Sequence, residues 1–577
     1  MFLITRVMKS YKISIEKFFN QSPFVEKVRL AFVKLEVLLP FCIITSIIIG
    51  FLYSIFNTDS HHWGFIVSTA LESIQGKRYF SEIYIQYGVG QPLFYHLMNY
   101  FFPINYTSIG FFTSIIYAFN LLILFYIIKT VSNQFIAIIT WSIIFLIHPY
   151  AIYPWPDYFS GFFISLSCLF LLKNYADSRQ KFNTQQLELN TFGASVPKLS
   201  VSPNNKLNDF SLRKKNISNK EIFCFLAGIC LFASFMFRST YLLSIGLASL
   251  SYIALSLIDI RLRQHNIYIV ICTFAGTASI YMLYLYTNED LYSWYSQAIG
   301  AGSSQYGMDL TFIYTILKNI FFPSSLIFSI FSIFYFSAIF TVAIFFIKRM
   351  YFKPEIIFLA LMGMAGAIQS THLYEIFRLT NASSPLYIIF AVIVYKIYLK
   401  SDNFWSINKI IFIFIFIFIF IFLALKFPIP TSNFPVYAGK LSSYSESKLP
   451  IFRWHQFRSD EANYYETLSQ LVCDGKRKIL NLTGDSVIPH LCKNQPNALS
   501  LPFFSPAMLK NISAKEAEKV SMGAFSVDEV IISDQSVPVN QNVKLVSVGS
   551  VKRPNSISIW QLGGAIVNIY HVELINK

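Results

Sequence analysis

Residues 57–97 read NTDSHHWGFIVSTALESIQGKRYFSEIYIQYGVGQPLFYHL and follow directly on the apolar segment Val37–Phe56. A helix that spans a bilayer needs roughly 20 apolar residues, and this segment is long enough. Asp59, His61 and His62 therefore stand just beyond a predicted membrane span. Ionisable side chains beside lipid are costly unless they face water or a partner, so the stretch predicts a first outer loop with a specific role.

The composition also indicates a membrane protein. Of the 577 residues, 54% are hydrophobic and 13% are charged, whereas a soluble protein carries about 25% charged residues. The net charge of +16 could suggest nucleic-acid binding. However, the basic residues gather in the N-terminal arm and in alternate loops, such as SLRKKNISNK and KRMYFK. This is the positive-inside asymmetry of a multi-pass membrane protein, so no nucleic-acid partner is expected.

The apolar windows predict about eleven transmembrane helices, of which the first is retained because no signal-peptide cleavage site follows it. With the N-terminus in the cytoplasm, eleven spans place the basic loops inside and the C-terminus outside. The run 221–258 is too long for one span and is interrupted by Arg238, so it is interpreted as a hairpin. The predicted spans are 36–56, 108–129, 133–148, 157–173, 221–237, 240–258, 266–286, 324–347, 354–371, 382–397 and 409–426.

Three domains are expected. Residues 1–35 form a cytoplasmic N-terminal arm, and residues 36–429 form an all-α polytopic membrane domain. Within the membrane domain, the polar segment 174–220 is interpreted as a flexible cytoplasmic loop. Residues 430–577 form an extracytoplasmic, soluble α/β domain, which is large enough for its own core.

Several segments of the C-terminal domain have recognisable patterns. KRKILNLTGDS and DEVIISDQS predict strands, and ISAKEAEKVSM predicts a helix capped by Ser513. VKLVSVGSVKRPNSISIWQL predicts further strands at the end. Cys473 and Cys492 flank a predicted strand, and both a disulfide and two buried thiols remain open for them.

Two interfacial helices are expected in the first outer loop, over WGFIVSTALESIQGKRYF and YGVGQPLFYHLMNYFF. Their apolar faces would rest on lipid, while the polar side chains would face water. Those side chains are Glu72, Lys77, Arg78 and Glu82. Taken one at a time, such residues more often cap helices or satisfy the interface than form a site.

The order of features in this loop resembles the first outer loop of GT-C superfamily membrane glycosyltransferases, especially the bacterial relatives of polyprenyl- or dolichyl-phosphate-mannose protein mannosyltransferases. GICLFASFMFRSTY similarly resembles the outer-face arginine of that family. The resemblance covers most of the chain and depends on the order of features, not on one motif. The matching positions are Asp59, the turn Gly76–Tyr79, Glu82, Tyr87, Gly88 and Pro92.

The resemblance implies transfer of a sugar from a polyprenyl-phosphate donor to a glycan, lipid or protein acceptor. Transfer would take place at the outer face of a bacterial inner (plasma) membrane and would invert the anomeric centre. Asp59 is expected to be the base that takes the acceptor proton, with a pKa raised by partial burial. Glu82 is expected to orient the acceptor or to share a metal.

The leaving lipid phosphate needs positive charge, for which arginine is well suited. Snorkelling interfacial anchors are the alternative for each basic residue. No cofactor is expected, and His61 and His62 are only weak candidates for metal ligands. The expected substrate-binding residues are Arg238, Arg378, His372, Glu375, Lys77, Arg78 and Tyr87.

Three other functions remain open. A transporter or flippase would place ionisable groups near the membrane midplane and show internal repeats. A glycan polymerase or ligase would use a similar lipid-linked donor, and a non-catalytic scaffold would use the outer domain to bind a partner. The geometric discriminator is whether Asp59, Glu82 and either Arg378 or Arg238 converge in one outward-facing, lipid-accessible cavity. If these groups point separately to bulk water, the transferase hypothesis loses its mechanism.

Overall fold

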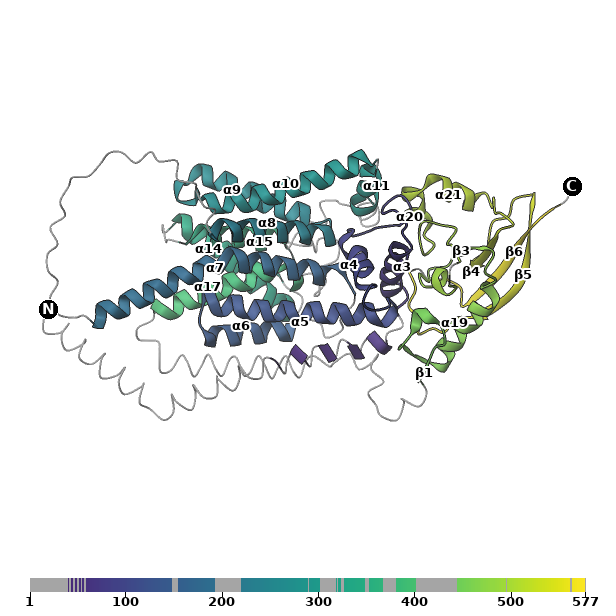
Figure 1. The fold of residues 1–577 in the computed structure, drawn as a ribbon, viewed down its shortest axis with the longest axis horizontal. Helices are drawn as coiled ribbons and strands as arrows, with labels where there is room; N and C mark the ends of the chain where they lie inside the picture. Colours follow the sequence, from purple (N-terminus) through teal and green to yellow (C-terminus); the bar gives the residue numbers. More distant parts are fainter. Residues whose placement is uncertain are drawn as a thin grey trace.

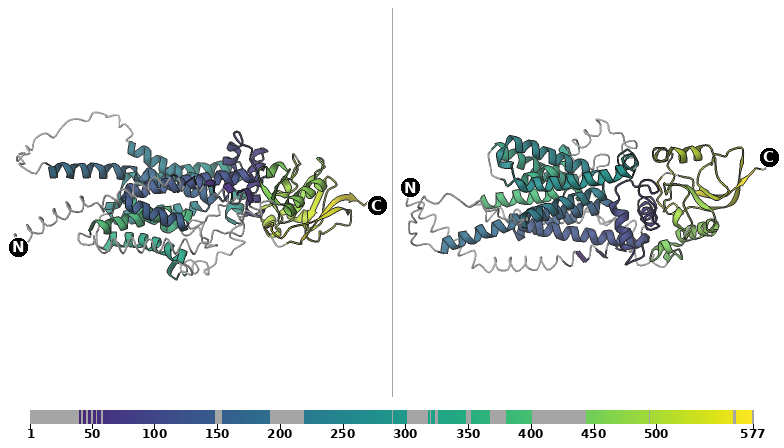
Figure 2. Two further views of the ribbon diagram at one scale, coloured as in Figure 1. Left: turned by 90° about the horizontal axis from the view of Figure 1, so that it is seen from below. Right: turned by 45° about the horizontal axis from the view of Figure 1, so that its top comes forward.

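The computed structural model describes residues 59–147, 154–191, 219–288, 290–300, 326–347, 352–366, 380–400, 444–493, 495–560 and 563–575, with isolated residues between 40 and 56 and between 318 and 322. It consists of a bundle of long helices with a smaller α/β domain, residues 444–575, at one end (Figure 1). We call this domain the outer domain and residues 59–105 the first outer loop, after the side of the membrane that the sequence predicts for them. The first outer loop lies between these two parts in all three views (Figures 1 and 2).

The long helices agree with the predicted spans. Every predicted span between 108 and 397 coincides with a helix, and five helices in the described part of the chain are long and apolar enough to cross a membrane. The span at 409–426 lies outside the described residues, and only isolated residues of the span at 36–56 are described, so the total of eleven is not tested. The helices are α5 (Tyr106–Val131), α6 (Gln134–Ile147), α7 (Pro156–Thr191), α8 (Asn219–Phe237), α9 (Tyr241–Ile258), α10 (His265–Thr287), α14 (Leu326–Ile347), α15 (Pro354–Gly366) and α17 (Ser384–Lys400).

Two details of the bundle bear on the sequence predictions. The chain breaks between α8 and α9 at Arg238, which confirms the predicted hairpin. In contrast, α7 continues to Thr191, where a loop was predicted from residue 174. This extension contains good helix formers and neither Gly nor Pro, so nothing in it stops the helix. Residues 192–218 lie outside the described residues.

The first outer loop contains α3 (His62–Ile74), the short helix α4 (Gly90–Met98) and the extended segment between them. α4 exposes Leu93 and Leu97, and the residues after it expose Tyr100 and Phe101, as expected of a helix at a lipid surface. α3 differs from the prediction, because most of its residues are buried between the bundle and the outer domain.

The outer domain has a four-stranded sheet in the order β3-β4-β6-β5. β3 (Lys478–Leu482) and β4 (Glu529–Ser533) are parallel, and β6 (Ile566–Leu574) pairs antiparallel with β4 and with β5 (Val543–Lys552). A separate antiparallel pair joins β1 (Tyr444–Glu446) to β2 (Gln456–Arg458). The helices of the domain are α19 (Ser459–Val472), α20 (Pro506–Ile512) and α21 (Ala514–Ser521).

Several predictions for this domain are confirmed. β3 and β4 fall within the two predicted strand segments, and the Ser513 hydroxyl accepts a hydrogen bond from the Glu516 amide at 3.3 Å, as a cap of α21. The segment SISIWQL was predicted to be a strand but forms none in its described part, and the last strand is β6. Cys473 and Cys492 form a disulfide with a Cα–Cα distance of 5.3 Å, so they are not two buried thiols.

The buried side chains form two cores. One fills the helix bundle. The other runs without a break from the first outer loop into the outer domain, and it includes Trp63, Tyr84 and Tyr95 on one side and Phe452 and Val487 on the other. The outer domain is therefore packed onto the loop and is not merely tethered to the membrane.

Candidate functional site

Asp59 stands immediately before α3 and is held by the first residue of that helix. The His62 amide donates to Asp59 Oδ1 at 3.0 Å, and His62 Nδ1 lies 2.8 Å from Asp59 Oδ2. The Tyr106 hydroxyl donates to the Asp59 carbonyl at 2.6 Å. A carboxylate at this position is also favoured by the partial positive charge of the helix N-terminus.

The pKa of Asp59 differs from the sequence expectation. Burial alone would raise the pKa, but the hydrogen bonds from His62 and the interactions with the two imidazoles outweigh burial and lower it below its ordinary value. The expectation of a raised pKa is therefore wrong. Asp59 is ionised at neutral pH and able to accept a proton, although as a weaker base than a buried carboxylate without such donors.

His61 and His62 stack on each other, with 3.8 Å between ring centroids. Burial lowers the pKa of His61 to about 3, so its imidazole is neutral at physiological pH. The donor atoms of Asp59, His61 and His62 lie within 4.8 Å of one another. One carboxylate and two imidazoles are donor types that suit a divalent metal ion, and the buried His61 Nε2 has no hydrogen-bond partner among the described residues. This group, which we name the Asp59 group, fits a metal by its donor types.

A second cluster lies where α8 ends and α7 begins. The Arg238 guanidinium forms an ion pair with Asp157, and both side chains are only 2% exposed. Arg238 Nε donates to the Thr240 hydroxyl at 3.1 Å. Arg238 is thus buried and paired, which excludes the alternative of a snorkelling anchor. Asp157 is not among the residues predicted from the sequence, although an acid at the start of an apolar span is itself a signal.

Two aromatic side chains connect these clusters. The Arg238 guanidinium lies 5.6 Å from the centre of the Tyr87 ring. The ring centroids of Tyr87 and Trp155 are 5.0 Å apart, and those of Trp155 and His62 are 4.9 Å apart. A continuous series of side-chain contacts therefore runs from Asp59 to Arg238.

Glycine at position 88 permits this arrangement. The Tyr87 carbonyl accepts hydrogen bonds from the Ser239 amide at 2.6 Å and from the Ser239 hydroxyl at 2.5 Å. At this close approach, a Cβ on Gly88 would overlap the carbonyl oxygen of Met236. The glycine of the Tyr-Gly pair is thus required by the contact between the loop and the end of α8.

The remaining predicted residues lie elsewhere. Lys77 Nζ pairs with the fully buried Glu72 at 3.1 Å, which corrects the expectation that Glu72 faces water. The Arg78 amide donates to Glu82 Oε2 at 2.7 Å, and these two side chains are 74% and 50% exposed. α3 has 13 residues, so roughly 20 Å of helix separates this end from Asp59.

The structure therefore brings together Asp59, His61, His62, Tyr87 and Arg238, but not Glu82, Lys77 or Arg78. The predicted convergence of Asp59 and Glu82 is not formed. Arg378, His372 and Glu375 lie outside the described residues.

The outer domain also contributes to the site. The Ser60 hydroxyl is hydrogen-bonded to Asp485, and the His61 amide donates to the Ser558 carbonyl at 3.1 Å. The rings of His61 and Trp560 are nearly perpendicular, with 4.2 Å between their centroids. The sequence gives no sign of these contacts, because they join segments more than 400 residues apart.

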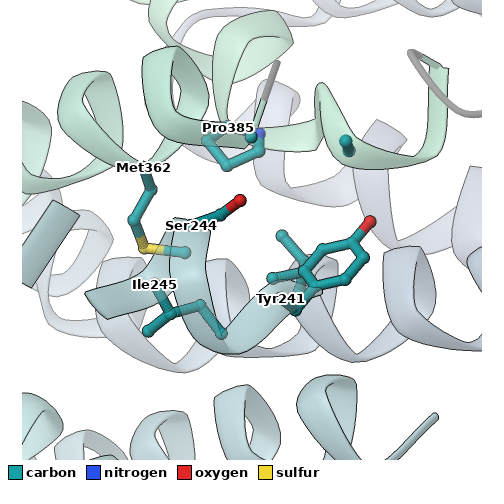
Figure 3. Close-up of a pocket in the computed structure, with 8 residues that line it drawn as sticks. Tyr241, Ser244, Ile245, Met362 and Pro385 are labelled. Atoms are coloured by element: carbon teal, nitrogen blue, oxygen red, sulfur yellow. The ribbon is translucent and has the colours of Figure 1, made fainter. Parts of the chain in front are cut away.

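The bundle also contains an apolar pocket (Figure 3). The hydroxyls of Tyr241 and Ser244, both on α9, are buried without a hydrogen-bond partner among the described residues. The residues that line the pocket do not include those of the Asp59 group, so we place the candidate site at Asp59. The lining residues are Ile164, Tyr241, Ser244, Ile245, Met362, Gly366, Ala382 and Pro385.

No model of a known protein family matches the sequence, and no curated protein matches it. Among solved structures, the chain is similar to the Archaeoglobus fulgidus oligosaccharyltransferase in a complex with Zn and sulfate, with 12% identity and a TM-score of 0.39 over 74% of this chain and 55% of that one. The apo form of the same protein has 11% identity and a TM-score of 0.43, over 85% of this chain and 69% of that one. The form tethered to an acceptor peptide has 10% identity and a TM-score of 0.38, again over 85% of this chain and 69% of that one.

The chain spans only about half the length of the first of these structures. TM-scores of this size do not establish a shared fold or a shared activity. A functional proposal must therefore rest on the residues and contacts of this chain.

Proposed function

We propose that the protein is an integral membrane glycosyltransferase. It transfers a sugar from a polyprenyl-phosphate donor to a glycan, lipid or protein acceptor at the outer face of a bacterial inner membrane. The observation that supports this most directly is the series of contacts from Asp59 to Arg238, which joins a carboxylate to a buried cation at the end of the bundle. The reaction class comes from the resemblance of the first outer loop to GT-C enzymes.

In the proposed reaction, the acceptor hydroxyl oxygen attacks the anomeric carbon while the bond from that carbon to the phosphate oxygen breaks. The hydroxyl proton passes to the Asp59 carboxylate, and the lipid phosphate leaves with the bonding electrons. A single displacement of this kind inverts the anomeric centre. His62 orients the carboxylate, because it contacts both of its oxygens.

The leaving phosphate develops negative charge, which Arg238 would stabilise. Asp157 already offsets part of the charge of Arg238, so the phosphate would have to approach beside this ion pair. Tyr87 lies against the guanidinium and would contact the donor there. Arg378, His372 and Glu375 remain proposed substrate-binding residues, whereas Glu82, Lys77 and Arg78 would have to act at the far end of α3.

No metal is required by this mechanism, although the Asp59 group has the donor types to hold one. A bound ion would supply positive charge beside the acceptor hydroxyl. It would also compete with the hydrogen bond between Asp59 and His62, because both need the same carboxylate. We expect that chelation by EDTA leaves transfer unchanged. A loss that Mn²⁺ or Mg²⁺ reverses would show instead that the group binds a metal.

The proposal is tested by transfer from a panel of radiolabelled polyprenyl-phosphate sugars with purified protein in lipid nanodiscs. Loss of a general base lowers the rate of a reaction by about 10²–10⁴-fold. We therefore expect the transfer rate of Asp59→Asn to be lower than that of the wild type by this factor. Asp528→Asn is the matched control, because Asp528 lies on the exposed surface of the outer domain. Undiminished transfer by Asp59→Asn would rule out Asp59 as the base.

A further inference from the structure

The carboxyl edge of the outer-domain sheet is occupied by the chain itself. Asp485 lies just beyond β3, and Asp534 lies just beyond the parallel strand β4. This edge is where α/β sheets usually bind their ligands. Here the Ser60 hydroxyl from the first outer loop reaches the edge and hydrogen-bonds to Asp485 Oδ1.

Asp485 is fully buried and its oxygens are occupied within the protein. Besides Ser60, the Tyr465 hydroxyl donates to Oδ2 at 3.1 Å and the Val487 amide donates to Oδ1 at 3.1 Å. Ser60 is 1% exposed. The hydrogen bond between Ser60 and Asp485 is therefore costly to break, because breaking it would leave a buried hydroxyl without its partner.

The segment from Ser558 to Trp560 holds the loop from a second side. The His61 amide donates to the Ser558 carbonyl at 3.1 Å, and the Trp560 amide donates to the Gly484 carbonyl at 2.9 Å. The Trp560 ring stacks on Phe503 with 4.7 Å between centroids, and it contacts the His61 ring nearly at a right angle. The same sheet edge thus anchors both Ser60 and the segment that contacts His61.

The start of α3 fits closely against this edge. A Cβ on Gly64 would lie 2.7 Å from Val487 Cγ2 and 3.4 Å from Ser486 Cβ. Gly64 therefore allows the first turn of α3 to pack directly on the residues that follow Asp485. The contacts fix Ser60, His61 and Gly64, which follow Asp59 within five positions.

We propose that the outer domain positions the base of the site. Asp485, Ser558 and Trp560 hold the segment 59–62 in place, so that the Asp59 carboxylate meets the acceptor in a fixed orientation. They act as positioning residues and do not contact the substrate. The sheet edge is consequently not an acceptor-binding site, because the first outer loop occupies it.

The test compares Ser60→Ala with Ser68→Ala in full-length protein in nanodiscs. Ser68 makes a hydrogen bond to His490 across the same interface at 2.5 Å, but two helical turns away from Asp59. Hydrogen exchange of the amides at 59–62 is measured first, because it needs no substrate. We expect exchange there to rise about tenfold in Ser60→Ala and to stay unchanged in Ser68→Ala.

Transfer is then measured in the same samples, and this readout rests on the proposed function. We expect kcat to fall about tenfold in Ser60→Ala with KM unchanged, since misplacement of a catalytic group lowers the rate of the chemical step. Ser60→Thr keeps the hydroxyl and should recover part of the loss. If Ser60→Ala does not fold, Trp560→Ala serves in its place, because Trp560 is partly exposed.

Unchanged exchange and unchanged transfer in Ser60→Ala would overturn the proposal, and so would raised exchange with normal transfer. A rise in acceptor KM at constant kcat would also overturn it, in favour of an acceptor-binding edge. If even the wild-type protein shows no transfer, the proposed function fails, and the exchange data alone decide whether the edge holds the segment 59–62.

Discussion

Arg238 and Asp157 form an ion pair that is removed from water, and the two residues depend on each other. Removing one partner of a buried pair leaves an uncompensated charge and costs roughly 3–5 kcal/mol. Replacing both partners with apolar residues of similar size is often tolerated, because no charge then remains buried. This difference separates a structural role of the pair from a role in binding phosphate.

We expect Asp157→Asn to lower the thermal unfolding temperature strongly, and the double variant Asp157→Leu/Arg238→Met to recover most of the loss. If Arg238 stabilises the leaving phosphate, the double variant should be well folded but inactive in sugar transfer. Thermal unfolding and the transfer assay on the same preparations check both parts. A stable, active double variant would show that the pair is only structural.

Glu72 introduces a pH dependence at the interface between α3 and the outer domain. Burial, opposed by the charge of Lys77, raises the pKa of Glu72 from 4.5 to about 7. The folded state therefore holds the proton more tightly than the unfolded state, and stability falls as the pH rises from about 4.5 to 7. The loss amounts to roughly 3 kcal/mol.

We therefore expect Glu72→Gln to be more stable than the wild type at pH 8 and similar to it at pH 5. The unfolding temperature at both pH values measures this difference. Glu518→Gln is the control, because Glu518 is exposed on α21. A Glu72→Gln variant that is less stable at both pH values would show that the ionised pair with Lys77 stabilises the fold.

At the scale of elements, the approach of the Tyr87–Gly88 segment to the end of α8 is the tightest constraint on the site. Gly88→Ala would push the segment away from Met236 and so separate Tyr87 from Arg238. We expect a loss of both stability and transfer. Gly246→Ala on α9 is the matched control, because a Cβ there meets no atom within 4 Å. Normal transfer by Gly88→Ala would show that the contact between Tyr87 and Arg238 is not needed.

The sequence predicts elements that depend on local patterns and misses those that depend on distant partners. The helices of the bundle and the Ser513 cap follow from apolar length and capping chemistry. α3 was expected on lipid because its polar residues have no visible partner in the sequence. Glu72 and Ser68 instead face Lys77 and His490.

The same limit applies to the candidate site. Asp59 and Arg238 could be singled out because they interrupt apolar segments. Glu82 is likewise an acidic residue of the first outer loop, so the sequence does not distinguish it from Asp59, yet it lies at the far end of α3. The pKa direction of Asp59 was missed because it depends on His62, whose orientation only the start of α3 determines.

At the scale of the molecule, the first outer loop lies at the end of the bundle that meets the outer domain (Figure 1). Asp59 belongs to this loop, and Tyr87 of the same loop contacts Arg238 at the end of α8. A transporter would be expected to place such groups near the middle of the membrane. One core continues from the first outer loop into the outer domain. Site, loop and outer domain therefore form one structural unit, so the orientation of the C-terminal domain would fix the side of the membrane on which the proposed reaction takes place.

The disulfide makes that orientation testable in intact cells. A bond between Cys473 and Cys492 is expected to persist only in an oxidising compartment. We therefore expect a membrane-impermeant maleimide to label intact spheroplasts only after treatment with a reductant, and not to label Cys473→Ser/Cys492→Ser. The double variant should also lose roughly 3 kcal/mol of stability, because the bridge closes a loop of 19 residues. Labelling that requires permeabilised membranes would place the outer domain, and with it Asp59, on the cytoplasmic side, where the proposed transfer could not take place.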